Sequence, residues 1–212
     1  MKSIGIYGKL PAHRDYVLLN LPESVEATLY DWLGPLLSEA QATLGYEAWL
    51  SAYLNASPCG YAIAFQRPEP MMYIGVMTSS VDAVGRYFPL LSGVQLTGEN
   101  ALVNFNPRAM QNVLNALVDQ QVNALHQRQS IEVHYQSVVA LLSKDLLTPW
   151  QDSSLAHLPM SAQSNDSIPL LEGVQSYWWA LDQPSLEIMC MGLPSADFYQ
   201  SLLALESAIH DG

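Results

Sequence analysis

Basic residues are scarce in this sequence of 212 residues. Eight Lys and Arg residues are outnumbered by twenty Asp and Glu residues, so the formal net charge is −12. The few basic residues are scattered and form no patch that would neutralise phosphates, which argues against nucleic acid as a partner. An anionic membrane surface would repel the chain for the same reason. A protein partner with a basic or mixed surface is favoured.

Long apolar runs and cysteine pairs are also missing. No run approaches the roughly 20 apolar residues of a membrane span, and the first apolar stretch is too short for a signal peptide. We therefore expect a cytoplasmic protein without membrane insertion. The two cysteines, Cys59 and Cys190, lie far apart and outside any CxxC motif. In a reducing compartment we expect both to be free, buried and hydrophobic in character.

What the sequence does contain is typical of a globular protein. Half of the residues are apolar and 13% are charged, which allows a substantial buried core. The length suits one domain over residues 1–212. A segment rich in Ser, Gln, Asn, Asp and Pro, residues 151–169, predicts a flexible loop within it.

Apolar periodicity predicts both strands and helices. Strands are expected at 3–8, 60–66, 71–77, 87–96, 177–181 and 186–191, with antiparallel hairpins at 67–70 and 182–185. Helices are expected from Pro22 to Leu44 with a kink or break at Gly34-Pro35, around 49–54, from Pro107 to Leu125, in the C-terminal half of 131–142, and after Ser195. Residues 9–20 are expected to form a loop.

Strands in hairpins with helices between them indicate the α/β (α+β) class. We predict a layered sandwich, in which a mixed, largely antiparallel sheet is covered by helices. Tyr177, Trp178 and Trp179 follow one another on a predicted strand, so their side chains alternate between its two faces. They could form an aromatic binding surface, but we favour a place in the core because aromatic side chains dominate core burial.

The first segment with chemical potential is GIYGKLPAHRDY, residues 5–16. A glycine and a lysine after a strand are features of a phosphate-binding loop. That loop needs four residues between its glycines and Lys-Ser/Thr at the start of a helix. Here two residues separate the glycines and Leu10-Pro11 follows the lysine, so the spacing argues against nucleotide binding.

The second segment is SSVDAVGRYFPL, residues 79–90. Neither Ser79 nor Ser80 stands in the strained GxSxG turn that activates a nucleophilic serine. None of the five histidines pairs with another at helical spacing or lies near a cysteine or an acidic cluster, which argues against a metal site. We predict no catalytic residues, no metal and no cofactor.

Asp15 and Asp82 lie in loops beside strands and could meet in space. Two carboxylates would suit acid–base chemistry. Alternatively, Asp15 or Asp82 binds Lys9 or Arg86 and fixes the loops, which we favour because buried charges need partners.

These two segments resemble the signatures of the TagF (ImpM) family, which is associated with the bacterial type VI secretion system. The family opens with a motif close to G-x-Y-G-K-L-P-x-x-G-D-F, and later carries P-S-V-D-x-V-G-R-x-F-P-L. Trp32-Leu33, Trp178-Trp179 and Gly192-Leu193-Pro194 match further features in the same order. Two positions depart from the pattern. Arg14 replaces a glycine, which would make a positive φ costly, and Ser79 replaces a proline.

The resemblance implies a cytoplasmic accessory protein with a layered α/β fold. It also implies post-translational repression of secretion and a link to the forkhead-associated scaffold protein of the system. We expect a binding module without enzymatic activity, whose candidate cluster is Lys9, Asp15, Tyr16, Asp82, Arg86 and Tyr87. These side chains could equally join the two loops.

Two alternatives remain open. A hydrolase using Asp15 and Asp82 predicts an open pocket that contains both carboxylates. A sensor of small anions predicts that the side chains of Lys9 and Arg86 are both exposed in a concave site.

Overall fold

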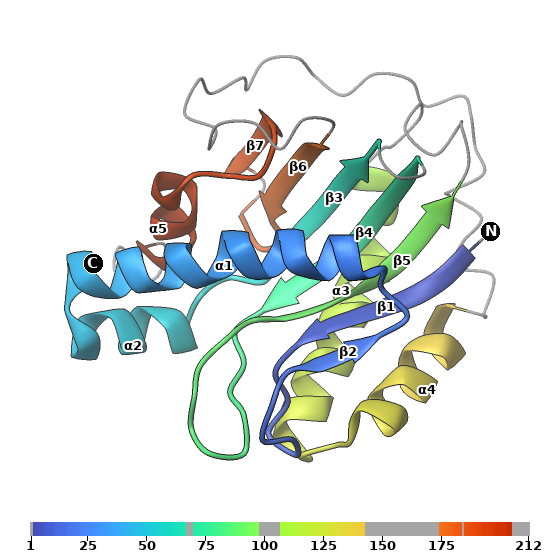
Figure 1. Ribbon diagram of the computed structural model, residues 1–212, viewed down its shortest axis with the longest axis horizontal. Coiled ribbons are helices and arrows are strands. Elements are labelled where there is room, and N and C mark those ends of the chain that lie inside the picture. Colours follow the sequence, from blue (N-terminus) through green and yellow to red (C-terminus); the bar gives the residue numbers. More distant parts are fainter. Residues whose placement is uncertain (1, 67–69, 98–106, 143–173, 184, 205–212) are drawn as a thin grey trace.

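The computed structural model describes residues 2–66, 70–97, 107–142, 174–183 and 185–204 (Figure 1). The loop predicted at 151–169 lies outside these residues. Seven strands and five helices are described: β1 (Lys2–Gly8), β2 (Val17–Leu19), α1 (Glu23–Leu44), α2 (Tyr46–Leu54), β3 (Cys59–Phe65), β4 (Met71–Thr78), β5 (Leu90–Thr97), α3 (Pro107–His126), α4 (Ile131–Leu142), β6 (Val174–Ala180), β7 (Glu187–Met191) and α5 (Ala196–Ala204).

The strands form one sheet in the order β2-β1-β5-β4-β3-β6-β7. Every described pairing is antiparallel, so the parallel component of the predicted mixed sheet is absent from the described strands. Both predicted hairpins, β3–β4 and β6–β7, are present. Helices α1, α2 and α5 cover one face of the sheet, and α3 and α4 lie against the other (Figure 1). The predicted layered α/β class is therefore confirmed.

The sheet buries both faces, so the core has two main parts and a small third cluster around Ile6, Leu10 and Leu90. The larger part packs apolar residues of α1, α2 and α5 against aromatic residues of the sheet. The smaller part lies under α3 and α4. Trp178 belongs to the first part, while Tyr177 and Trp179 belong to the second. Their predicted place in the core is confirmed. Cys59 and Cys190 are both buried and free, also as predicted.

The ends of several elements lie up to three residues from their predicted positions, and three predictions differ from the structure in more than this. Val17–Leu19, expected in a loop, forms the edge strand β2 by pairing with β1. Helix α1 runs through Pro35 without a break. Proline has no amide hydrogen, so the carbonyl one turn earlier loses its helical donor. Because Pro35 lies on the exposed side of the helix, this carbonyl can bond to water instead. Helix α4 occupies the whole of Ile131–Leu142 instead of its C-terminal half.

Candidate functional site

The two motif-bearing loops meet at one end of the sheet. Gly8, the last residue of β1, and Thr78, the last residue of β4, both pair with Leu90 at the start of β5. The loops that follow β1 and β4 therefore begin side by side. A Cβ on Gly8 would lie 2.0 Å from the carbonyl oxygen of Pro89, and the Gly8 φ is +132°. Only glycine allows the two loops to approach this closely.

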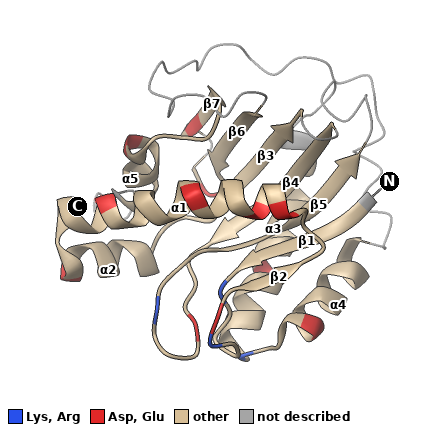
Figure 2. Cartoon of the chain, viewed as in Figure 1, with Lys and Arg blue, Asp and Glu red and all other residues tan. Residues whose placement is uncertain are grey.

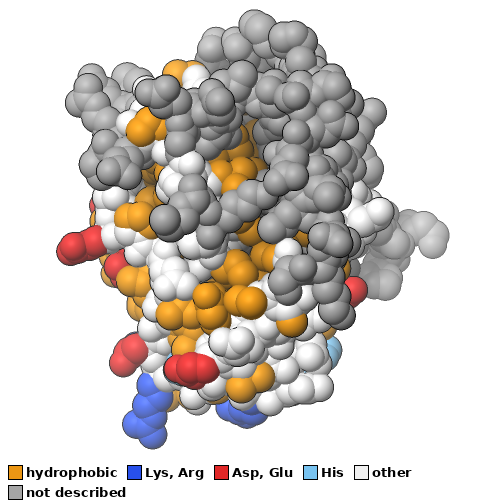
Figure 3. Space-filling model, turned by 90° about the vertical axis from the view of Figure 1, so that its right-hand side faces the viewer, with side chains coloured by type: hydrophobic (Ala, Val, Ile, Leu, Met, Phe, Trp, Pro, Cys, Tyr) orange, Lys and Arg blue, Asp and Glu red, His pale blue; other side chains and the backbone are white. Residues whose placement is uncertain are grey.

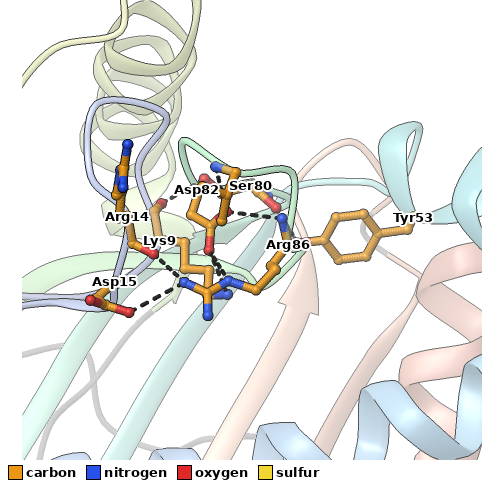
Figure 4. A network of polar contacts seen from close by, with 8 residues as sticks. Lys9, Arg14, Asp15, Tyr53, Ser80, Asp82 and Arg86 are labelled. Atoms are coloured by element: carbon orange, nitrogen blue, oxygen red, sulfur yellow. Dashed lines mark hydrogen bonds and ion pairs between the residues drawn. The ribbon is translucent and has the colours of Figure 1, made fainter.

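Asp82 is the centre of the cluster (Figure 4). Its side chain is fully buried and lies 3.0 Å from the Lys9 ammonium and 2.7 Å from Nε of Arg86. The backbone amides of Val84 and Arg86 also donate to its carboxylate, at 3.0 and 2.9 Å. Burial alone would raise the pKa of Asp82. The hydrogen bonds from Arg86 and Lys9 outweigh this effect and hold the pKa well below its usual range.

Hydrogen bonds of Ser80 and Tyr53 connect the loops around Asp82 to helix α2. The Ser80 hydroxyl donates to the carbonyl oxygen of Lys9 at 2.6 Å. The Tyr53 hydroxyl donates to the Ser80 carbonyl oxygen and accepts from the Ser80 amide, both at 2.9 Å. All three side chains are buried. We call Lys9, Ser80 and Asp82 the inner half of the cluster, because their contacts join two loops and a helix.

Arg86 connects the centre to the surface. Its side chain is 55% exposed, and its Nη2 lies 3.2 Å from Asp15, whose side chain is 90% exposed. The same nitrogen donates to the carbonyl oxygen of Arg14. Tyr16 lies beside this pair and is 41% exposed. We call Asp15, Tyr16 and Arg86 the outer half of the cluster.

The rings of Tyr16 and Tyr87 lie in different surroundings. The Lys9 ammonium is 4.9 Å from the Tyr16 ring centroid, and Phe88 packs edge-on against the same ring at 4.8 Å. Tyr87 instead packs against Trp49 and Tyr53 of α2. Of the other five predicted residues, the structure therefore gathers four around Asp82 and places the ring of the fifth, Tyr87, with α2.

Neither departure from the family motif distorts the loops. Arg14 has no positive φ, so glycine is not needed at that position. The positive φ angles of these loops fall on Gly8 and Gly85. Ser79, where a proline is usual, donates through its hydroxyl to the Tyr53 carbonyl oxygen and gains a second contact to α2.

His13 contributes contacts that sequence analysis missed. Its carbonyl oxygen accepts from the Ala83 amide at 2.8 Å. Its Nε2 accepts from the Ile131 amide at 3.0 Å, which satisfies a free donor at the start of α4. The partners are 118 residues apart in the chain. No local pattern could have shown this pairing, or that of Tyr53 with Ser80.

The arrangement limits what the cluster can do chemically. A carboxylate with a strongly lowered pKa is a weak base, so Asp82 is poorly suited to general-base catalysis. Lys9 is buried and bound to Asp82, whereas an anion sensor was predicted to expose both cations. Among the described residues, no group of three or more His, Cys, Asp and Glu side chains is placed to hold a metal ion.

The described helices were compared with the requirements for crossing a membrane. None of them combines the length and the apolar character that a transmembrane helix needs.

Comparison with known proteins places the two loops within a recognised domain. Residues 5–141 match the family model of the TagF N-terminal domain, described as type VI secretion system-associated. The chain also resembles the crystal structure of PA0076 from Pseudomonas aeruginosa PAO1. The TM-score is 0.63 and the identity 24%, over 95% of this chain and 94% of that one. At this identity the likeness concerns the fold alone. No match was found among curated proteins.

Proposed function

Since the chain belongs to the TagF family of type VI secretion system-associated proteins, we propose that it is a cytoplasmic regulator that represses secretion by binding a protein of that system. The partner we propose is the forkhead-associated scaffold protein. The mode of action is occupation of the partner's surface, with no reaction catalysed and no cofactor required.

The observation that carries this proposal is the division of the cluster into two halves. The inner half is buried and holds both loops and α2 in one arrangement. The outer half presents Asp15, Tyr16 and Arg86 at the surface on that fixed base. Loops that are already ordered lose little conformational entropy on binding, so such a surface favours association with a protein partner.

The loop tip adds an apolar contact to this surface. Val84 is 58% exposed and lies between two residues of the cluster, Asp82 and Arg86. Its amide is held by the Asp82 carboxylate at 3.0 Å. An exposed apolar side chain on a fixed turn is well placed for burial against a partner.

The test is calorimetric titration of the purified chain with the scaffold protein from the same secretion system. Val84→Asp changes the loop tip, and Met191→Asp is a matched control because Met191, on edge strand β7, is 59% exposed. We expect the natural chain and Met191→Asp to bind equally. Val84→Asp should weaken binding by about tenfold, since it replaces the apolar contact of the loop tip by a carboxylate that would lose its hydration in the interface.

Two outcomes would contradict this proposal. Equal binding by Val84→Asp and Met191→Asp would move the interface away from the loops. No heat of binding for the natural chain, confirmed by a second method such as co-sedimentation, would remove the direct-partner mechanism. Circular dichroism of each variant checks that the fold is intact.

A further inference from the structure

Helix α1 has an exposed tyrosine that none of the contacts described so far explains. Tyr30 is 52% exposed, and its ring lies edge-on to Tyr16 at a centroid distance of 5.8 Å. Leu18, on edge strand β2, is 40% exposed and lies opposite Tyr7, whose ring stacks on Tyr16. We call Tyr16, Leu18 and Tyr30 the aromatic patch. Figure 3 shows hydrophobic side chains gathered on the side of the molecule where β1 and β2 lie.

The charges that α1 places beside this patch are all negative, and the two cations near Tyr16, Lys9 and Arg86, are already paired with carboxylates. Along α1 the charged residues are Glu23, Glu26, Asp31 and Glu39, with no Lys or Arg (Figure 2). Glu23, Glu26 and Tyr30 are spaced i, i+3, i+7, so they share one face of the helix. The two glutamates of the first turn are explained by the partial positive charge at the N-terminus of the helix, which favours acidic side chains there. It does not account for Asp31 or for an exposed ring beside it.

A buried hydroxyl under the patch is also unpartnered. Tyr7 is 1% exposed, and its hydroxyl has no hydrogen-bond partner in the described structure. The Tyr7 ring stacks on the Tyr16 ring at a centroid distance of 6.0 Å. The pKa of Tyr7 is raised chiefly by burial, with smaller contributions from Tyr16, Glu26, Tyr30 and Asp31. A buried hydroxyl without a partner is costly. A donor from a partner could satisfy this hydroxyl only if the side chains above it shift, because the oxygen is not accessible to solvent.

We infer that the aromatic patch and the α1 carboxylates bind an arginine side chain from a basic segment of the protein partner. This inference rests on the proposed function and specifies the chemistry of its interface. A guanidinium stacks on a tyrosine ring and bonds to carboxylates at the same time. Lys9 already lies over the Tyr16 ring, so the molecule uses the same kind of contact internally. A second copy of the chain is disfavoured as occupant by the shared charge of −12.

The direct test uses a hexa-arginine peptide and the full chain with ¹³C-labelled tyrosine. Ring signals of Tyr16 and Tyr30 should shift on titration, while those of Tyr46 should not. Tyr46 is a matched control because it is 50% exposed on α2 and has a ring contact with Trp49. Tyr30→Ala should weaken peptide binding by about two- to fivefold, whereas Tyr30→Phe and Tyr46→Ala should retain it. Glu26→Gln with Asp31→Asn should also weaken binding and reduce its salt dependence.

Equal shifts of Tyr46 and Tyr30, or equal binding by Tyr30→Ala and the natural chain, would overturn the inference. Measuring the same variants against the scaffold protein separates this inference from the proposed function. Scaffold binding that is insensitive to Tyr30→Ala and to the charge variant overturns the inference and leaves the proposed function standing. Peptide binding at Tyr30 without any scaffold binding supports the patch and contradicts the proposed partner.

Discussion

The inner and outer halves of the loop cluster each contain one aspartate and one basic side chain, but in opposite surroundings. Asp82 is fully buried and accepts from Lys9, Arg86 and two backbone amides. Asp15 is 90% exposed and has one ion pair, to Arg86. A buried charge that loses its partner keeps its desolvation cost, while an exposed one is solvated by water. Burial therefore separates residues that hold the loops from residues that can meet a partner.

The largest effect is expected from Lys9→Met. This change leaves the Asp82 carboxylate buried without its ammonium partner, so the free energy of unfolding should fall by about 3–5 kcal/mol. Urea unfolding followed by circular dichroism measures it. Arg14→Met, which removes an exposed cation from the same loop, is the control and should change stability by less than about 0.5 kcal/mol. Similar losses in both variants would show that the burial of Lys9 beside Asp82 contributes nothing beyond that of an exposed cation in the same loop.

Acid titration distinguishes the contribution of Asp82, in the loop cluster, from that of His134, which lies on helix α4. His134 is fully buried, and its Nε2 lies 2.9 Å from the Ser92 hydroxyl. Its Nδ1 has no hydrogen-bond partner among the described residues. Burial lowers the pKa of His134 from 6.5 to about 4. As pH falls, the unfolded chain therefore binds a proton at this histidine before the folded protein does. The stability from neutral His134 is complete above pH 6.5 and is lost as pH falls towards 4, by up to about 3 kcal/mol.

The Asp82 contribution is lost over a different pH range. Its pKa in the folded protein is held below the usual value, so its stabilisation is present above about pH 4 and is lost only at lower pH. His134→Gln should flatten the stability profile between pH 4 and 6.5 without changing the loss below pH 4. The same change at His126, which is exposed, is the matched control. A slope that survives His134→Gln would assign the titration to another group.

A smaller effect is expected at Gly85, in the turn that presents the outer half. Its φ is +88°, and a Cβ there would meet nothing within 4 Å. Gly85→Ala should therefore cost about 1–2 kcal/mol, from backbone strain alone. Gly8→Ala should cost more, because its Cβ would also collide with the Pro89 carbonyl oxygen. Thermal unfolding compares the two, and an equal loss would show that the loops do not depend on their close approach.

Sequence patterns predicted the parts of the fold that are encoded locally. The two hairpins, the amphipathic face of α1 and the alternation of Tyr177, Trp178 and Trp179 each follow from short-range spacing. Strand β2 was missed because three residues give no periodic signal, and it exists through pairing with β1. The first turn of α4 was missed because part of its support is the distant His13 ring.

The candidate site was predicted as a set of residues but not as an arrangement. The motifs indicated that Asp82, Lys9 and Arg86 would be close together. They could not show that Asp82 is buried and Asp15 exposed, because exposure depends on how the loops pack against Tyr53 and Phe88. Tyr30 carries no motif, and its position beside Tyr16 depends on the placement of α1 over β1 and β2.

The most direct test of the division is the same isosteric change in each half, Asp82→Asn and Asp15→Asn, measured by urea unfolding at pH 7. We predict that Asp82→Asn lowers the free energy of unfolding by about 3 kcal/mol or more, since it leaves Lys9 buried without a counter-charge. Asp15→Asn should change it by less than about 0.5 kcal/mol. Equal changes in the two variants would contradict the account, because the cluster would then act as one unit with no separate binding surface.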